Sequence, residues 1–369
     1  MAEPGPRTTG QAHLGPGSQL RDGRDDGRCR SREPRLDARR GLPQSGGAVA
    51  VYTDITDEEL VELLKGFDLG APLSFKGVAE GVENSNFLLE TETGRYFLTV
   101  YEQRVNEADL PFYLGLMRHL AGNGFPCAVP IASRSGELVQ RLRGKAAAIV
   151  SFLPGLSARR PSAAHCREAG MGLAWLHEAG AGFTMHKAND LGAQSWAGLF
   201  APLREAAERL KPGLALTIEQ DLEVILGGWP EALPQGVVHA DYFPDNVFFQ
   251  GTRFAGAIDF YFACDDAYAY DIAVALNAWC FEADGSFNIT SARQLVAGYE
   301  QRRPLSRAER AALPILAHGA AMRFFLTRLQ AWGATPQGAL VRPKDPMEYE
   351  RKLAVHRSSP DLVFFGDGA

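Results

Sequence analysis

The sequence predicts an α+β fold of two lobes, a small N-terminal lobe built on an antiparallel sheet and a larger, mainly helical C-terminal lobe. Short runs rich in β-branched and aromatic residues, separated by turn residues, are concentrated between residues 74 and 152. Runs with helical periodicity fill most of the chain from residue 161 onward. A chain of 369 residues with 46% hydrophobic content can bury the cores of both lobes.

The first 48 residues differ in composition from the rest of the chain. They carry nine arginines against six acidic residues, no lysine and few large apolar side chains. We expect a disordered tail, because such a segment cannot bury enough apolar surface to fold; a misassigned translation start is an alternative. A nucleic-acid contact or a targeting peptide is less favoured, since acidic residues interrupt the arginines. The predicted organisation is tail 1–48, N-terminal lobe 49–152, C-terminal lobe 153–357 and C-terminal tail 358–369, with a hinge at LeuProGly 153–155.

The N-terminal lobe is predicted to begin with a helix. Thr56 and Glu59 have the spacing of a capping box, and the helix should end near Gly66. A second helix is expected from Asn106 to Gly122, because AsnGly stops it before a proline. The predicted antiparallel strands are Ser74–Ala79, Asn86–Thr91, Arg95–Tyr101, Leu138–Arg141 and Ala146–Phe152.

The C-terminal lobe is predicted to be helical around one β-hairpin. Val247 to Phe249 form the first strand of this hairpin, Gln250 to Arg253 the turn, and Phe254 to Ile258 the returning strand. The hairpin lies between the third and fourth helices of the lobe. The predicted helices are 161–179, 195–210, 217–229, 271–282, 290–302 and 306–332.

Three polar side chains flank this hairpin at a spacing that indicates phosphoryl transfer. Asp241 precedes Asn246 by five positions in VHADYFPDNVFF, and the returning strand leads to Asp259 in AIDFYF. In protein kinases an Asp and an Asn at this spacing serve as catalytic base and Mg²⁺ ligand, and a second metal-binding Asp follows. Asn246 and Asp259 supply hard oxygen ligands for magnesium bound to ATP, while Asp241 accepts the proton of the attacking hydroxyl. An isolated HxD triplet is usually incidental, but the paired motifs predict a protein-kinase-like fold.

Composition excludes several other classes of protein. The net charge of −6 argues against a nucleic-acid surface, and no apolar run is long enough to span a bilayer or to form a secretory leader. Five scattered cysteines lack the spacing of a zinc site and are expected to be reduced thiols. We therefore expect a cytoplasmic enzyme with no nucleic-acid or membrane partner. His239, beside the catalytic motif, is expected to brace backbone rather than to ionise.

These motifs resemble the aminoglycoside phosphotransferase and choline kinase superfamily, whose catalytic loop is HxDxxxxN followed by IDF or IDW. Within it, the segments Asn106 to Leu114 and Tyr261 to Cys280 are similar to the bacterial homoserine kinase branch. That resemblance implies transfer of the γ-phosphate of ATP to the side-chain hydroxyl of L-homoserine, giving O-phospho-L-homoserine for threonine biosynthesis. The resembling stretches lie within residues 50–357 and are GVENSNFLLET 81–91, RYFLTVYEQRVNEADLPFYLGLMRHLA 95–121, the catalytic loop, AIDFYFACDDAYAYDIAVALNAWC 257–280 and RFFLTRL 323–329.

The resemblance also implies roles for individual residues. Asp241 matches the base, Asn246 and Asp259 match the metal ligands, and Asp271 matches an acid that braces the catalytic loop, although a helix N-cap explains Asp271 equally well. The superfamily commonly places a basic residue on the third strand to hold ATP phosphates, where this chain has Thr99. The candidates to replace it are Lys76, Lys145 and Arg104. For the phosphate loop the candidates are Asn84, Ser85 and Asn86, for which a plain hairpin turn is the alternative.

A zwitterionic acceptor such as homoserine needs a cation for its carboxylate and an acid or carbonyl for its ammonium group. Arg323 is the candidate for the carboxylate, and Asp265 and Asp266 are candidates for the ammonium group. Tyr261 is a candidate pocket wall. For Arg323 a surface position on an amphipathic helix is the alternative, and for Tyr261 a place in the core.

Two other functions remain open from the sequence. One keeps the phosphoryl transfer but changes the acceptor to choline, ethanolamine, methylthioribose or an aminoglycoside. Choline needs an aromatic cage and an aminoglycoside needs an acid-rich site, and neither is evident here. The other is an inactive nucleotide-binding pseudokinase, which the missing third-strand lysine favours and the intact catalytic motif opposes.

Overall fold

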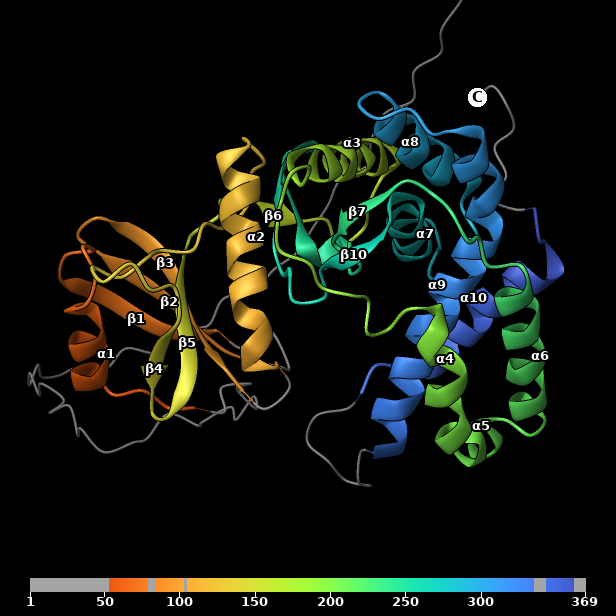
Figure 1. The fold of residues 1–369 in the computed structure, drawn as a ribbon, viewed down its shortest axis with the longest axis horizontal. Helices are drawn as coiled ribbons and strands as arrows, with labels where there is room; N and C mark the ends of the chain where they lie inside the picture. The colour runs from red at the N-terminus through yellow and green to blue at the C-terminus, as the bar shows by residue number, and fades with distance from the viewer. Residues whose placement is uncertain (1–52, 79–83, 103–104, 335–342, 362–369) are drawn as a thin grey trace, which may run out of the picture. The chain divides into compact units, whose positions relative to one another are not determined.

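The computed structural model describes residues 53–78, 84–102, 105–334 and 343–361. The chain is divided after Gly47, and every described residue belongs to the second unit, Ala48–Ala369. The predicted tail 1–48 and Arg104 therefore lie outside the described residues. The second unit combines an antiparallel sheet with a larger helical part, so the predicted α+β, two-lobed fold is confirmed (Figure 1).

The N-terminal lobe is a five-stranded antiparallel sheet. Its order is β1-β2-β3-β5-β4, and each neighbouring pair is antiparallel. The β4–β5 turn contains Arg143, at φ 50°, followed by Gly144. The strands are β1 (Pro72–Val78), β2 (Asn84–Thr91), β3 (Gly94–Tyr101), β4 (Gln140–Leu142) and β5 (Lys145–Ser151).

Two helices contribute to the cores on opposite faces of this sheet. Helix α1 (Asp57–Leu64) begins with the predicted capping box of Thr56 and Glu59 and packs with Leu89 and Leu98. Helix α2 (Leu110–Gly122), preceded by the 3-10 turn η1 (Glu107–Asp109), shares its core with Tyr101 and alternate residues of β5. Because side chains alternate along a strand, the sheet has an α1 face and an α2 face.

The helical lobe contains α3 to α10. Helices α3 and α8 approach closely at two glycines, since a Cβ on Gly170 would meet the Leu295 carbonyl oxygen at 1.9 Å and one on Gly298 would meet that of Arg167 at 1.9 Å. The helices are α3 (Ala163–Ala179), α4 (Ala193–Phe200), α5 (Arg204–Leu210), α6 (Leu214–Gly227), α7 (Tyr268–Trp279), α8 (Ile289–Glu300), α9 (Arg307–Ala334) and α10 (Pro346–Ser358).

The helix prediction differs from the structure in two places. The expected single helix 195–210 is two helices, because Pro202 interrupts the regular bonding and a 3-10 turn, η2 (Ala201–Leu203), joins them. Helix α10 was not predicted. Its sequence is rich in charge, and it is held by buried polar contacts such as the Lys352 ammonium on the Asn277 carbonyl rather than by a wide apolar stripe.

Two small sheets frame the catalytic segment. Strand β7 (Gln235–Val238) pairs with β10 (Cys264–Ala267), and β8 (Val247–Gln250) pairs with β9 (Arg253–Ala257) and with β6 (Leu156–Ser157). The predicted hairpin is thus present, and β6 follows directly after the predicted hinge. Among the described residues no helix combines the length and the apolar character that a bilayer crossing requires.

Candidate active site

The candidate catalytic loop connects β7 to β8 and ends in the 3-10 turn η3 (Pro244–Asn246). The Asn246 side-chain amide Nδ2 donates to the Asp241 carbonyl oxygen at 2.9 Å and to Asp241 Oδ2 at 3.1 Å. The two residues that were predicted from their spacing are therefore in direct contact. Since the amide nitrogen is turned toward Asp241, the Asn246 oxygen Oδ1 points away from it and is available to a cation.

Asp259 reaches this loop through the backbone of β9. The amide of Ile258 donates to the Asn246 carbonyl at 2.9 Å, and the His239 ring nitrogen Nε2 lies 3.0 Å from the Ile258 carbonyl. His239 is fully buried, and its Nδ1 accepts the Asp241 amide at 3.3 Å. Asp259 itself has φ 64°, in the left-handed region, which costs a non-glycine residue free energy. His239 thus ties together the two segments that carry the candidate catalytic residues.

Ala240, the residue before Asp241, is held from both sides. Its φ is 59°, so it too is in the left-handed region. Its amide donates to Asp271 Oδ1 at 2.9 Å, and its carbonyl accepts a hydrogen bond from Arg323 Nη1. These two contacts maintain a backbone conformation that an alanine rarely adopts, and they orient the following Asp241.

Asp271 is an anion buried in helix α7. Its Oδ2 accepts the His239 amide at 2.7 Å and lies 3.1 Å from His177 Nε2. Burial by itself raises the pKa of Asp271, but the His177 hydrogen bond and nearby charges and amides lower it below its usual value. Burial lowers the pKa of His177, so this imidazole is neutral, and its Nδ1 lies 2.8 Å from the Tyr299 hydroxyl. Asp271 bonds the catalytic loop and does not cap α7, which starts at Tyr268.

The donor set of this loop fits a magnesium ion that is shared with nucleotide phosphates. Asn246 Oδ1 and the Asp259 carboxylate are both hard oxygen ligands. Protein sites commonly supply Mg²⁺ with only one or two carboxylates, and phosphates and water complete its coordination. Within the described ranges, no group of three or more His, Cys, Asp or Glu side chains is arranged to hold a metal alone. The arrangement is therefore suited to a cation that arrives with ATP.

The candidate phosphate-loop residues lie in a strand, so the predicted turn at Asn84 to Asn86 is wrong. They are the first three residues of β2 and pair with the end of β3. Asn84 Oδ1 accepts the Glu102 amide at 3.3 Å, and Asn86 Oδ1 accepts the Thr99 hydroxyl at 2.8 Å. Ser85 is buried on the α1 face, where its hydroxyl donates to Glu102 Oε1 at 2.8 Å. Residues 81–83 of that loop lie outside the described residues.

The two candidate lysines, Lys76 and Lys145, lie on opposite faces of the N-terminal sheet. Lys76 is exposed in β1 opposite Leu88, on the face that carries Tyr101. Lys145 in β5 is on the α1 face, where it pairs with the Glu102 carboxylate and donates to the Thr53 hydroxyl at 2.8 Å. Tyr101 bonds the Tyr261 hydroxyl at 3.0 Å, so its face is the one directed to the catalytic segment. Of the two, Lys76 is therefore the better candidate for ATP phosphates.

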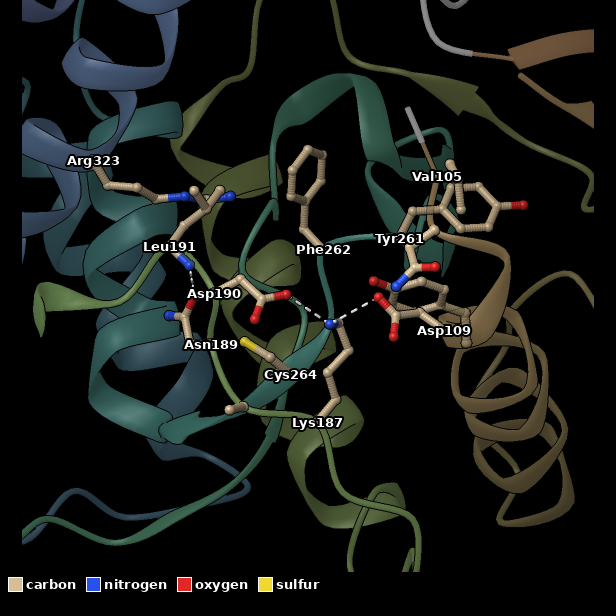
Figure 2. A pocket seen from close by; sticks show the side chains of 13 residues that line it. Val105, Asp109, Lys187, Asn189, Asp190, Leu191, Tyr261, Phe262, Cys264 and Arg323 are labelled. Atoms are coloured by element: carbon tan, nitrogen blue, oxygen red, sulfur yellow. Dashed lines mark hydrogen bonds and ion pairs between the residues drawn. The ribbon is translucent and has the colours of Figure 1, made fainter. Parts of the chain in front are cut away.

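A pocket of about 220 Å³ adjoins the catalytic loop. Tyr261, two residues after Asp259, and Arg323, which bonds Ala240, both line it. Its remaining charged side chains are Asp109, Lys187 and Asp190. Figure 2 shows the Lys187 ammonium between the two carboxylates, at 3.0 Å from Asp109 Oδ2 and 2.7 Å from Asp190 Oδ2. The pocket is thus a small site lined by two acidic and two basic side chains.

Asp265 and Asp266, the candidates for the acceptor ammonium group, do not line this pocket. Asp265 Oδ2 accepts the Lys187 amide at 3.0 Å, and Asp266 Oδ2 accepts the Asn189 side-chain amide at 2.6 Å. Burial raises the pKa of Asp266. Both acids thus anchor residues 186–190 to β10, and this segment in turn presents Lys187 and Asp190 to the pocket.

The sequence reasoning missed the three charged residues at the centre of the pocket. Asp109 lies in the stretch Asn106 to Leu114 that resembles homoserine kinases, but its charge was not considered. Lys187 and Asp190 lie in HKAND at 186–190, a polar run between two helices with no motif of its own. Their alternating charge was the available clue, although only the fold shows that Asp109 completes the group.

Comparison with known proteins identifies relatives along nearly the whole described chain. Residues 74–305 match the model of the phosphotransferase enzyme family. A homoserine kinase of Phenylobacterium zucineum (strain HLK1) is 71% identical over 321 residues, which are 87% of this chain and 99% of that protein. A homoserine kinase of Caulobacter sp. (strain K31) is 68% identical over 322 residues, 87% of this chain and 100% of that protein.

Solved structures with low sequence identity share the fold. Amicoumacin kinase hAmiN, solved with AMP-PNP, Ca²⁺ and Ami, has a TM-score of 0.61 at 16% identity, covering 83% of this chain and 93% of its own. Choline kinase from Cryptosporidium parvum Iowa II has a TM-score of 0.58 at 13% identity, covering 84% and 97%. The family match and the relatives above 65% identity together show that this chain belongs to the phosphotransferase enzyme family and, within it, to the homoserine kinases.

Proposed function

We propose that this protein transfers the γ-phosphoryl group of MgATP to the side-chain hydroxyl of L-homoserine, giving O-phospho-L-homoserine for threonine biosynthesis. The observation that carries the proposal is the contact of Asn246 with Asp241 beside a pocket whose charges suit an amino acid. The curated relatives at 54% to 71% identity bear the name homoserine kinase, which supports the choice of acceptor.

Asp241 is proposed as the residue that accepts the proton of the acceptor hydroxyl. Its carboxylate is fixed by Asn246, and the backbone before it is pinned by Asp271 and Arg323. Fixing the base in this way aims the hydroxyl oxygen at the phosphorus, and positioning of this kind supplies much of the catalysis in phosphoryl transfer. Asn246 and Asp259 are proposed to bind Mg²⁺, which when bound neutralises charge on the transferring phosphoryl group. Lys76 is proposed to contact the ATP phosphates.

The size and the charge of the pocket favour a small zwitterion over the other acceptors. Pockets that bury drug-sized ligands have volumes of roughly 300 to 1,000 Å³, and this one has about 220 Å³. Two acidic and two basic side chains line it, so its formal charge is zero, whereas a polycationic aminoglycoside needs an excess of acids.

A choline cage would require aromatic faces that are open to the ligand. The rings of Tyr113 and Tyr261 pack edge to face on each other at 5.7 Å, and the Arg323 guanidinium stacks over the Phe262 ring at 5.2 Å. These aromatic side chains already have partners, so the pocket favours an amino acid over a quaternary ammonium ion.

The test is ADP release by the purified full-length protein with MgATP and, in turn, L-homoserine, choline, methylthioribose and kanamycin. A preference of at least about 100-fold in kcat/KM for L-homoserine is expected, because only this acceptor pairs both of its charges. Preference for another acceptor would refute the substrate assignment. Nucleotide binding without turnover on any acceptor would instead favour an inactive pseudokinase. The cytoplasmic location and the absence of nucleic-acid partners stay predictions.

A further inference from the structure

The acceptor pocket contains a group of three charges that none of the proposed catalytic steps uses. Lys187 lies between Asp109, from the turn before α2, and Asp190, from the segment after α3. The Lys187 side chain is 15% exposed, whereas the Asp190 side chain is 75% exposed. The ion pair with Asp190 by itself therefore has little effect on stability, since exposed pairs contribute little. The Lys187–Asp109 pair is more buried, at 15% and 27% exposure, and all three charges line the pocket, which suits a binding role.

We propose that the Asp109–Lys187–Asp190 triad recognises the α-amino-acid head group of the acceptor, Lys187 binding its carboxylate and the flanking aspartates its ammonium group. The proposal rests on the proposed function and adds residues that determine its substrate class. A lysine ammonium has three N–H donors, and the two aspartates use two of them. Among the described residues no further hydrogen bond or ion pair occupies the third, so it remains for a ligand in the pocket that Lys187 lines.

In the triad each aspartate lies next to Lys187, just as the two charged groups of an α-amino acid lie next to each other. An α-amino acid carries its carboxylate and its ammonium group on the same carbon atom. A carboxylate that contacts Lys187 therefore places the adjacent ammonium group next to one of the aspartates that flank Lys187 (Figure 2). Each carboxylate retains acceptor capacity after bonding one lysine N–H, so the ligand can bind without breaking the existing ion pairs.

Lys187 is charged and held in position before a ligand binds. Burial alone lowers the pKa of Lys187, but the hydrogen bonds from its ammonium to Asp190 and Asp109 raise it above the ordinary lysine value. Its backbone is also fixed, because its amide donates to Asp265 Oδ2 at 3.0 Å and its carbonyl accepts the Asp265 amide at 2.7 Å. The charge that would meet the carboxylate is thus held in place before the ligand arrives, which reduces the entropy lost on binding.

Arg323, the residue predicted from the sequence for the carboxylate, has other contacts in the structure. Its Nη1 donates to the Ala240 carbonyl, and its guanidinium stacks over the rings of Phe262 at 5.2 Å and Phe324 at 4.3 Å. It is 3% exposed. These contacts make Arg323 a positioning residue for the catalytic loop. Its Nε has no hydrogen-bond partner among the described residues. We assign the acceptor carboxylate to Lys187, whose ammonium Asp109 and Asp190 already hold at the pocket.

The test compares three acceptors that differ only in the head group: L-homoserine, 3-amino-1-propanol, which lacks the carboxylate, and 4-hydroxybutanoate, which lacks the ammonium group. The readout is the ratio of kcat/KM values within each variant, so that a general loss of activity or of folded protein cancels. Lys187→Met should lower the homoserine to aminopropanol ratio about tenfold or more, because it removes one charged hydrogen bond to the carboxylate. Lys187→Arg should restore part of that ratio, and Asp109→Asn should lower the homoserine to hydroxybutanoate ratio.

Two control variants test whether changes in these ratios are specific to the triad. Lys65→Met removes an exposed lysine, paired with Glu62 on α1, and should leave every ratio unchanged. Arg323→Lys should lower kcat for all three acceptors alike and leave the ratios unchanged. If Lys187→Met lowers activity on all acceptors equally, Lys187 only joins α2 to the segment after α3, and the proposal is refuted.

A binding measurement separates failure of this inference from failure of the proposed function. L-Homoserine is titrated calorimetrically into the wild-type protein and into Lys187→Met, each with MgADP. Binding to the wild type that weakens about tenfold or more in the variant supports the triad even if no phosphate is transferred, and in that case only the proposed function fails. No difference between the two proteins refutes the triad whatever the turnover.

Discussion

Replacing Asp271 by Asn tests how the catalytic loop is held. The buried carboxylate accepts three hydrogen bonds: the His239 amide at 2.7 Å, the Ala240 amide at 2.9 Å and His177 Nε2 at 3.1 Å. Asparagine keeps one acceptor oxygen and directs its NH₂ group at a donor. At least one buried backbone amide then loses its partner, and the remaining bonds lose the assistance of the charge.

The magnitude follows from these contacts. A buried donor left without a partner costs about 1 to 3 kcal/mol, and a hydrogen bond to a charged group contributes about 1.5 to 3 kcal/mol. Since His177 can change its tautomer and accept from the new amide, we expect Asp271→Asn to lower the free energy of unfolding by about 3 kcal/mol. That is less than the total stability of a typical domain, about 5 to 15 kcal/mol, so the variant should still fold. Because Ala240 is less firmly held, kcat should fall by about tenfold or more, while the KM for ATP changes little.

The assay is urea denaturation followed by steady-state kinetics, both at pH 7.5. Asp245→Asn is the matched control, because Asp245 is an exposed acid in the same loop; a surface change of this kind should alter stability by no more than about 0.5 kcal/mol. If Asp271→Asn matches the stability of that control, the carboxylate does not brace the loop. A stability loss with unchanged kcat would show that the brace does not orient Asp241.

Four further predictions concern catalysis, metal, pH and the N-terminal segment. Asp241→Ala should lower kcat about 100-fold or more while leaving the Kd for ATP unchanged by calorimetry, and loss of ATP binding would contradict its role as base. Asp259→Ala should raise the Mg²⁺ concentration needed for half-maximal activity, so an unchanged Mg²⁺ titration would argue against ligation. Burial and the nearby charges of His318 and Lys352 lower the pKa of His356 to about 3 in the folded protein. As the pH falls below about 6.5, the His356 imidazole is therefore protonated in the unfolded chain but not in the folded one. The free energy of unfolding should drop by about 2 kcal/mol between pH 7 and pH 5 because of this residue. Measured by urea unfolding, the stability of the His356→Gln variant should fall by about 2 kcal/mol less than that of the wild type between pH 7 and pH 5. An equal loss in both proteins would exclude His356 as the source. Removing residues 1–48 should leave kcat/KM unchanged, since relatives matched over 99% to 100% of their length align with 87% of this chain, and a large loss of activity would contradict this expectation.

The elements that the sequence determined are those set by neighbouring residues. The capping box of α1, the β8–β9 hairpin and the spacing of Asp241 to Asn246 depend on contacts within a few positions, so local chemistry was sufficient to predict them. The family resemblance extended this local pattern to the fold, which the structure and the comparisons confirm.

Prediction from the local sequence failed where contacts between distant segments determine the structure. Asn84 to Asn86 carry turn-forming residues, yet pairing with the end of β3 draws them into a strand. The bonds of Asp271 to His177 and to the catalytic loop join residues that are 94 and about 31 positions apart along the chain. No sequence periodicity encodes such contacts.

The acceptor pocket depended most on tertiary structure. Asp109 precedes α2, Lys187 and Asp190 follow α3, and Arg323 belongs to α9, so their side chains meet only after these elements have packed. The sequence by itself determined the chemistry, through a loop whose residue types suit phosphoryl transfer. Only the tertiary structure decided which charges face the acceptor, because the direction of a side chain into a pocket is set by the packing of the helix or strand that carries it.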